Sequence, residues 1–399
     1  MNILSVCLLA SAVAFTSATE SIKHLAPIDV KRANSTTLET DQLYVGGVDL
    51  LSQPDYKVAG TTGYAQLSGN TLTLNNFTYN GAGYTYTDST TAGTYRGGIM
   101  YFGTEDLEIN VEGENTITVD NSNQTFRTYG IGFWPGKSNT EFLAKNLTFT
   151  GDGSFNLTSG IGTVSMGIGV NTKAGKVIFD GPDVNVAGAD DPSTSGSSYG
   201  LNEDYSGTNV TAVIKTGNIS IIGGKTDTSV GIGCNVTQEG GNLIAKSTID
   251  TGNPWRPYGI WSSYGTMIFN GGTANISSVM KYGVNTGKLK VGPNMKGITI
   301  TGSKGAVYGL DTYSSKIEVD SLAWTDIEGT GDPTYIQANS NPNLFTSSYK
   351  KLKIGGFIKA TATGYDGDYD GQAHSISVTT SIPSTGTTSS MVPLLMPVR

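Results

Sequence analysis

A short motif of one bulky residue, one glycine and one aliphatic residue recurs along the chain and constrains its fold more than any other feature. Typical copies are YGIGF from Tyr129, VGIGC from Val230 and YGIWS from Tyr258. Repetition at spacings of this kind is the sequence signature of a repeat architecture. The motif glycines lie 24 to 37 residues apart, at Gly98, Gly130, Gly167, Gly200, Gly231, Gly259, Gly283 and Gly309.

Two further strand-like runs separate successive copies of the motif. Examples of the first are LEINVEG from Leu107 and KVIFDG from Lys176, and an example of the second is DVNVAG from Asp183. Alternation of apolar and polar residues gives each strand one apolar face. Three short strands cannot close a core alone, but coils stacked on one another bury their aliphatic side chains together. We therefore predict an all-β fold, a right-handed parallel β-helix (solenoid).

Other all-β architectures fit the repeat less well. A propeller blade needs four strands and usually about 40 or more residues, and sandwich strands carry no repeated motif. We expect the β-helix to span residues 43–325, with its first coils and N-terminal cap in 43–79, where strands occur without the motif. Residues 326–360 have a loop-like composition, and we expect them to form a C-terminal cap or linker.

The start of the chain indicates secretion. Residues 1–18 place an apolar run from Ile3 to Phe15 before small residues, with Ala18 as the expected cleavage position, which is the order of a signal peptide. Residues 19–42 then form a linker, and we expect no membrane span after signal removal. Cleavage leaves Cys234 as the one cysteine, so no internal disulfide can form; its place in GIGCN predicts a buried thiol.

Composition excludes two classes of protein. The chain has 54 Gly, yet its 20 Tyr and 12 Phe supply enough apolar surface to argue against disorder. The net charge is −8 and the five arginines are scattered, whereas nucleic-acid binding needs clustered cations. We expect no nucleic-acid partner.

Part of the repeat resembles a known family. The run GGIMYFGTEDLEINVEGENTITV from Gly97, followed by YGIGF, is similar to secreted repeat proteins of anaerobic bacteria, and the similarity extends over residues 45–320. The resemblance implies an extracellular β-helix surface protein of a kind sometimes described as carbohydrate-binding or adhesin-like.

The C-terminal segment carries a second resemblance. The run TATGYDGDYDGQAHSISVTT from Thr361 is similar to the opening strands of bacterial immunoglobulin-like surface modules, with Tyr369, Asp370, Gly371 and His374 at the characteristic positions. The resemblance implies a partial, incomplete immunoglobulin-like module over residues 361–399. The same residues form a DxDxDG pattern, but its twelfth position is Ser377 instead of the glutamate that calcium loops use, so we expect no metal.

An enzyme is the principal alternative, because many β-helices are polysaccharide lyases or glycoside hydrolases. Hydrolysis needs grouped carboxylates, and galacturonan hydrolases of this fold add a histidine, but the two histidines lie outside the repeats. The acidic pairs Asp190–Asp191 and Glu203–Asp204 adjoin a long turn, where we expect solvated side chains. Arg256 is the one candidate for a lyase base, without a lyase motif around it. We predict no catalytic residues and no cofactor.

Aromatic residues give a better argument for binding. Flat rings beside the motif can stack on sugars while neighbouring polar groups bind hydroxyls. The alternative is that they fill the core or cover a corner, which we favour for Tyr258. The leading hypothesis is a secreted or cell-surface, monomeric, adhesin-like rod that binds an extracellular glycan without catalysis; a purely structural spacer stays open. The candidate glycan-binding residues are Trp134, Trp255, Tyr258, Trp261 and Tyr264.

Overall fold

The structure of the protein is a computed structural model in which most of the described residues belong to β-strands. It describes residues 42–87, 93–121, 125–138, 141–191, 196–204, 209–250, 254–309, 316–319, 323–327, 333–336, 350–355, 359–363 and 377–381. Over these ranges the helices are two short 3-10 turns, Leu50–Ser52 and Pro54–Tyr56, and no helix is long and apolar enough to span a membrane. The predicted signal peptide lies outside the described residues.

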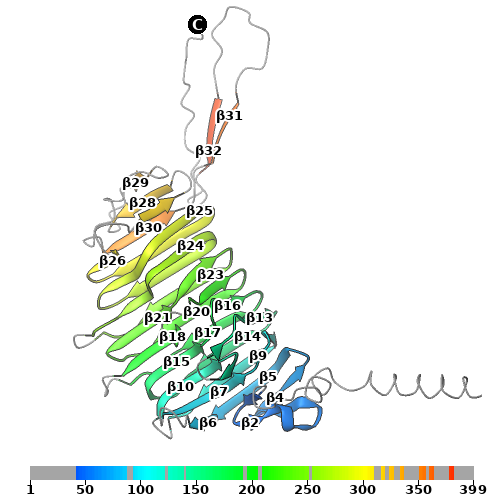
Figure 1. Ribbon diagram of the computed structural model, residues 1–399. Helices are drawn as coiled ribbons and strands as arrows, with labels where there is room; N and C mark the ends of the chain where they lie inside the picture. Colours follow the sequence, from blue (N-terminus) through cyan, green and yellow to red (C-terminus); the bar gives the residue numbers. More distant parts are fainter. Residues whose placement is uncertain are drawn as a thin grey trace, which may run out of the picture.

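The strands stack one above another along the molecule in sequence order, as Figure 1 shows. One parallel ladder contains the motif strands. We number the coils from 1 to 8 by these strands, which are β7 (Thr94–Phe102), β10 (Thr125–Phe133), β15 (Gly162–Val170), β18 (Ser197–Glu203), β21 (Thr228–Gly233), the start of β24 (Tyr258–Ser278), the start of β25 (Tyr282–Gly302) and β26 (Gly305–Gly309).

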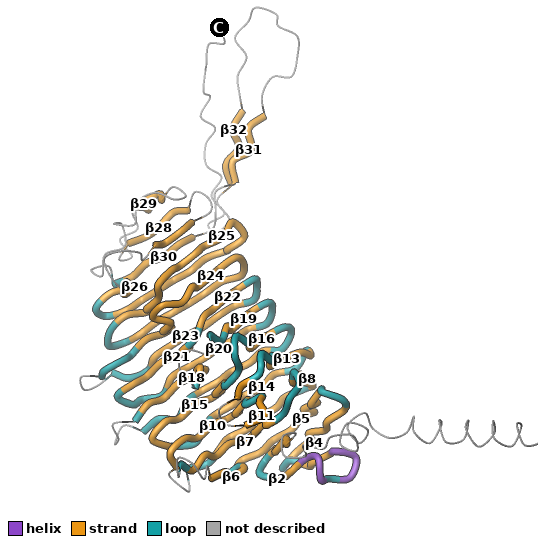
Figure 2. The backbone as a smooth tube through the Cα atoms, in the orientation of Figure 1, coloured by secondary structure: helices purple, strands orange, loops and turns teal. Residues whose placement is uncertain are grey.

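Two further parallel ladders complete coils 1 to 7, so the fold is an all-β solenoid of stacked parallel strands (Figure 2). β5 (Thr71–Gly81) runs through both, and β24 and β25 run through all three ladders. The second ladder continues through β8 (Leu107–Glu112), β13 (Leu147–Gly151), β16 (Lys176–Phe179), β19 (Thr211–Ile214), β22 (Asn235–Gln238) and β27 (Lys316–Val319). The third continues through β9 (Glu114–Val119), β14 (Ser154–Thr158), β17 (Asp183–Ala187), β20 (Asn218–Gly223) and β23 (Asn242–Ser247).

The interior of the coils is the main hydrophobic core. The motif aliphatics lie in register from one coil to the next and are buried there, as Ile99, Ile131, Ile168, Leu201, Ile232, Ile260, Val284 and Val307. Phe149 and Phe179 stack within the same core at 5.1 Å between ring centroids. Cys234 is buried in the same core, as predicted, and burial raises the pKa of its thiol.

The motif needs glycine because two consecutive residues face the interior. Ile131 belongs to the core, and a Cβ added to Gly130 would lie 2.6 Å from Cγ of Leu157 on the third ladder. Strict alternation cannot place neighbouring side chains on one face, so the strand bends between them. The same collision with a third-ladder aliphatic recurs at Gly98, Gly200, Gly259 and Gly283. Glycine at this corner leaves room for the adjacent strand.

The last copy of the motif does not occupy the motif position. Tyr282 pairs with Gly305 and Val284 pairs with Val307, so coil 8 uses Gly305, Ala306 and Val307 instead of the Tyr308–Gly309 predicted from the sequence. Ala306 is small and buried, and Val307 continues the aliphatic ladder. Burial of the β-branched valine decides the register, and Tyr308 lies opposite Asn285.

Antiparallel strands cover the first coil. β1 (Gln42–Val45) and β6 (Tyr84–Thr87) both pair with β7, and β4 (Thr62–Ser68) pairs with β5. An exposed parallel edge invites pairing with another chain, and these strands occupy it. Shorter strands complete this region and the loop after coil 2: β2 (Val48–Asp49), β3 (Lys57–Ala59), β11 (Gly136–Ser138) and β12 (Glu141–Phe142).

Antiparallel strands also follow the last coils. β30 (Lys351–Gly355) pairs with the end of β25 and with β28 (Ala323–Ile327), which pairs with β29 (Pro333–Ile336). Part of the segment with loop-like composition is therefore strand. β31 (Lys359–Thr363) and β32 (Ser377–Ser381) pair with each other. The rest of the predicted immunoglobulin-like module, including the DxDxDG pattern, lies outside the described residues.

Candidate functional site

The outer side of the motif ladder carries a second hydrophobic cluster, separate from the core. Because Gly130 and Ile131 both face inward, Tyr129 before them faces outward, where the ring lies against Gly169 of the next coil. Tyr129 is nevertheless fully buried. The motif aliphatic therefore faces the core, as predicted, whereas the motif tyrosine packs in an outer cluster. We call this the outer cluster; its buried members are Tyr95, Met100, Tyr129, Trp134, Met166, Tyr199 and Val230.

At the N-terminal end the outer cluster is closed by aromatic packing around Trp134. The Trp134 ring lies edge-to-face with Tyr95 at 5.2 Å, with Phe102 at 5.5 Å and with Tyr129 at 5.5 Å between centroids. Its side chain is 8% exposed. The neighbouring rings occupy the surfaces that a sugar would contact, so the structure places this candidate among packing residues.

The middle of the outer face contains a buried polar network. Asp204 forms an ion pair with Arg127 and accepts a hydrogen bond from the Tyr129 hydroxyl at 2.7 Å. The Asp204 side chain is 0% exposed. Burial and this carboxylate raise the pKa of Tyr129 well above its ordinary value. The prediction of a solvated acidic pair is wrong for Asp204, because Arg127 and Tyr129 arrive from two coils away to compensate its charge.

In the other acidic pair, Asp190–Asp191, one residue is buried and one is exposed. Asp191 is buried, contrary to prediction, whereas Asp190 is exposed and its carboxylate accepts the backbone N–H of Lys225 at 2.8 Å. Glu203 accepts the N–H of Val210 at 3.2 Å. These carboxylates satisfy loop backbone groups, which is a structural role.

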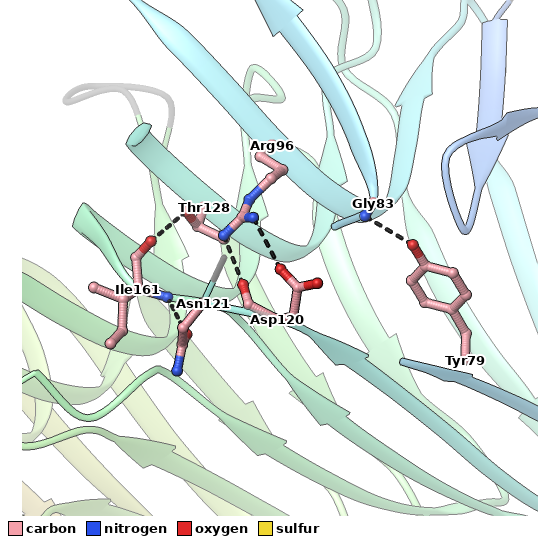
Figure 3. A network of polar contacts seen from close by, with 7 residues as sticks. All are labelled: Tyr79, Gly83, Arg96, Asp120, Asn121, Thr128 and Ile161. Atoms are coloured by element: carbon pink, nitrogen blue, oxygen red, sulfur yellow. Dashed lines mark hydrogen bonds and ion pairs between the residues drawn. The ribbon is translucent and has the colours of Figure 1, made fainter. Parts of the chain in front are cut away.

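A corner network of the first coils is also structural (Figure 3). Arg96 is almost fully buried and donates to the Asp120 carbonyl at 2.6 Å and to its carboxylate at 3.2 Å. One coil on, Thr128 donates to the Ile161 carbonyl at 3.1 Å. Each contact joins a motif strand to the turn that follows the third-ladder strand of the same coil. The burial of Arg96 leaves it inaccessible to a ligand.

The C-terminal end of the outer face is open. Trp255 is 68% exposed, and Trp261 is partly buried. The guanidinium carbon of Arg256 lies 4.0 Å from the Trp255 ring centroid and 4.6 Å from the Trp261 ring centroid. Such cation–π contacts hold both indoles in place. The predicted pair is therefore brought together, with an arginine over both rings.

The loop before β24 positions this group. Trp255 donates its backbone N–H to the Asp227 carbonyl of the coil below at 2.9 Å, and its own carbonyl accepts from Lys281 Nζ of the coil above at 2.8 Å. Pro254 and Pro257 flank the loop and are buried, and their rings fix the backbone on either side of the tryptophan. The exposed indole is anchored to both neighbouring coils.

Tyrosines extend the open end across the last coils. The Tyr258 and Tyr282 rings are 6.5 Å apart, and the Tyr282 and Tyr308 rings are 4.7 Å apart. Tyr258 is buried, as the favoured packing interpretation requires, while Tyr308 is 38% exposed. Tyr264 lies in β24, and its side chain is outside the described part. We name the open aromatic face by Trp255, Arg256, Trp261, Tyr282 and Tyr308.

Sequence reasoning missed two neighbours of this face, Lys281 and Lys304. Lys304 donates its backbone N–H to the Lys281 carbonyl at 2.9 Å, which places the two lysines at equivalent positions of successive coils. Each immediately precedes a residue at the motif-tyrosine position, Tyr282 or Gly305. Lys281 directly precedes a motif tyrosine, so including that position in the motif would have identified it. Lys304 could not be identified in this way, because its position depends on the register of coil 8 that the structure shows.

No protein-family model, curated protein or solved structure matches the chain significantly. Within the described ranges, no three histidine, cysteine, aspartate or glutamate side chains gather as metal ligands. The fold and the outer face thus define an all-β solenoid with an open cluster of aromatic and cationic side chains at one end.

Proposed function

We propose that the chain is an extracellular, non-catalytic interaction protein of right-handed parallel β-helix form that binds glycans through the open aromatic face. The predicted signal peptide supports secretion. The resemblance to secreted repeat proteins and to immunoglobulin-like surface modules supports a place at a cell surface. The protein acts as a monomeric, adhesin-like rod.

The observation that carries the proposal is the exposure of Trp255. The exposed Trp255 indole belongs to the open aromatic face together with Trp261 and Tyr308, and contiguous exposed apolar patches on a folded surface mark interaction sites. Its backbone is fixed by Asp227 and Lys281, so little conformational entropy is lost when a ligand stacks on the ring. A rigid, flat, exposed ring is the surface that sugar rings pack against.

The arrangement does not favour the enzyme alternative. The Asp204 side chain is closed off from solvent and its charge is compensated by Arg127. Arg256, the candidate lyase base, has its guanidinium over two indoles. These contacts support a positioning and binding role for the residue.

Affinity electrophoresis of the mature chain through gels containing neutral or acidic polysaccharides tests the proposal. We expect retardation of the wild-type chain by at least one polysaccharide. In Trp255→Ala the dissociation constant for that polysaccharide should rise about tenfold or more, since tryptophans that a bound partner covers are characteristic hot spots of binding. Phe126→Ala is the matched control: Phe126 is an exposed aromatic, 44% accessible, four residues before the motif glycine of coil 2, as Trp255 is in coil 6.

Each alternative predicts a different result. A structural spacer would migrate unretarded in every gel. A lyase or hydrolase would release unsaturated products or new reducing ends from the polysaccharide. Equal losses of polysaccharide affinity in Trp255→Ala and Phe126→Ala would show that the open aromatic face is not the binding site.

A further inference from the structure

Three cationic side chains gather around the open aromatic face of a chain whose net charge is −8. Arg256 lies over the Trp255 ring, and Lys281 Nζ donates to the Trp255 carbonyl. Lys304 occupies the position of Lys281 one coil on. Each comes from a different coil, so the stacking of coils 6, 7 and 8 creates the group. We call it the cationic cluster.

The three members of the cationic cluster have no acidic partner among the described residues, whereas five other basic residues of the solenoid are ion-paired. Ion pairs elsewhere are Arg96–Asp120, Arg127–Asp204, Lys145–Glu105, Lys215–Asp180 and Lys225–Asp250. Arg256, Lys281 and Lys304 form no ion pair with any described carboxylate. Uncompensated positive charge on an acidic protein attracts anions locally and steers them toward this end of the face.

The geometry of Arg256 suits a carboxylate. Its guanidinium carbon lies 4.0 Å from the Trp255 ring centroid and 4.6 Å from the Trp261 ring centroid, and a guanidinium carries its N–H donors in one plane. A planar fork of donors binds a carboxylate through two parallel hydrogen bonds. The Lys281 ammonium, which lies against the Trp255 carbonyl, is a second donor for the same carboxylate. Burial and the nearby Lys304 lower the pKa of Lys281, and the negative charge of a bound anion would favour its charged form.

We infer that the open aromatic face recognises acidic polysaccharides, with sugar rings stacked on Trp255 and their carboxylates bound by Arg256, Lys281 and Lys304. The inference rests on the proposed glycan-binding function and names its substrate class. Ring stacking alone accepts neutral and acidic sugars alike, whereas the cationic cluster distinguishes them by charge. Sulfated sugars share the anionic chemistry and can accept the same two hydrogen bonds from the fork of Arg256, so the test includes a sulfated polysaccharide as a separate ligand.

The test compares four immobilised ligands with the full mature chain: a polyuronate, its methyl-esterified neutral form, a sulfated polysaccharide and single-stranded DNA. We expect the polyuronate to bind most tightly, and its affinity to fall as salt rises because the contacts are charged. Lys281→Gln and Lys304→Gln together should weaken polyuronate binding about tenfold, since hydrogen bonds to charged groups are worth about that factor or more. Binding of the neutral form should change less than about twofold.

Lys215→Gln is the matched control, because it removes the same charge from an exposed lysine paired with Asp180 on another part of the surface. It should leave polyuronate binding unchanged. Equal affinities for the polyuronate and its neutral ester, or no loss in the double lysine variant, would overturn the acidic-sugar inference while leaving the glycan-binding proposal standing. Tighter binding of sulfated sugar or DNA would also overturn it. Failure of every polysaccharide to bind would reject both.

Discussion

Gly130→Ala adds one methyl group at the inner corner of coil 2. The new Cβ would lie 2.6 Å from Cγ of Leu157 and 2.6 Å from the carbonyl oxygen of Gly167. One neighbour is a core side chain and the other is backbone of the adjacent coil, so neither can move without disturbing a ladder. Overpacking of a dense core costs about 1 to 3 kcal/mol, and we expect a loss near the upper end of that range.

Urea unfolding measures this cost through the free energy of unfolding, provided that the slope with denaturant is unchanged. Leu157→Ala alone should cost about 2 to 5 kcal/mol by leaving a cavity. In the double variant the added methyl enters space that the leucine has vacated. The combined loss should therefore fall below the sum of the two single losses by about 1 kcal/mol or more, as for other contacting residues.

Gly297→Ala is the control for the effect of replacing a strand glycine by alanine without overpacking. A Cβ there meets only the Ile354 carbonyl oxygen at 3.9 Å, an ordinary contact. We expect its free energy of unfolding to stay within about 1 kcal/mol of the wild-type value. A Gly130→Ala protein as stable as the Gly297→Ala protein, or strictly additive losses with Leu157→Ala, would refute the packing explanation of the motif.

Three further predictions concern buried groups. The Cys234 thiol should not react with a thiol reagent at pH 8 until the protein is unfolded, because it is buried and its pKa is raised. Asp204→Ala should cost about 3 kcal/mol by leaving Arg127 without its partner, and Arg127→Met with Asp204→Leu should recover part of that loss in thermal unfolding. The pKa of Tyr129 is raised above its ordinary value of 10. The contribution of its hydroxyl to the free energy of unfolding is therefore fully present below pH 10 and is lost as the pH rises further. The stability gap between wild type and Tyr129→Phe should therefore narrow above pH 10, by up to about 1.4 kcal/mol per pH unit.

Each of these predictions has a contrary result. Rapid modification of native Cys234 would show that its coil opens readily. An Asp204→Ala protein of wild-type stability would mean that solvent already screens the ion pair with Arg127. A gap between wild type and Tyr129→Phe that stays constant from pH 9 to 11 would show that the hydroxyl of Tyr129 is not shielded.

The register of the coils could be predicted from the sequence because one steric requirement repeats. The glycine–aliphatic pairs occupy equivalent positions in neighbouring strands of the first ladder. The positions of the motif glycines in the sequence therefore predict the strand register, although the turns between them vary in length. The prediction failed at coil 8, where Tyr308–Gly309 matches the motif in letters. Burial of Val307 next to Val284 outweighs that match, and alanine is small enough to take the glycine position.

The candidate site was predictable only where its residues are close in sequence. Trp255 and Trp261 lie in one ten-residue run, and the structure joins them through Arg256. The burial of Trp134 depends on Tyr95 and Phe102 of another coil, which no local pattern contains. The same limitation concealed the buried position of Asp204, the closeness of Lys281 to Trp255, and the adjacency of Lys281 and Lys304 in successive coils.

The most direct test of the account is a crystal structure of the mature protein with a uronic-acid oligosaccharide. We expect difference density for a sugar ring parallel to the Trp255 indole, with a carboxylate within hydrogen-bonding distance of Arg256 or Lys281. Density for the bound sugar on a different surface, with the Trp255 ring still bare, would contradict the assignment of glycan binding to the open aromatic face.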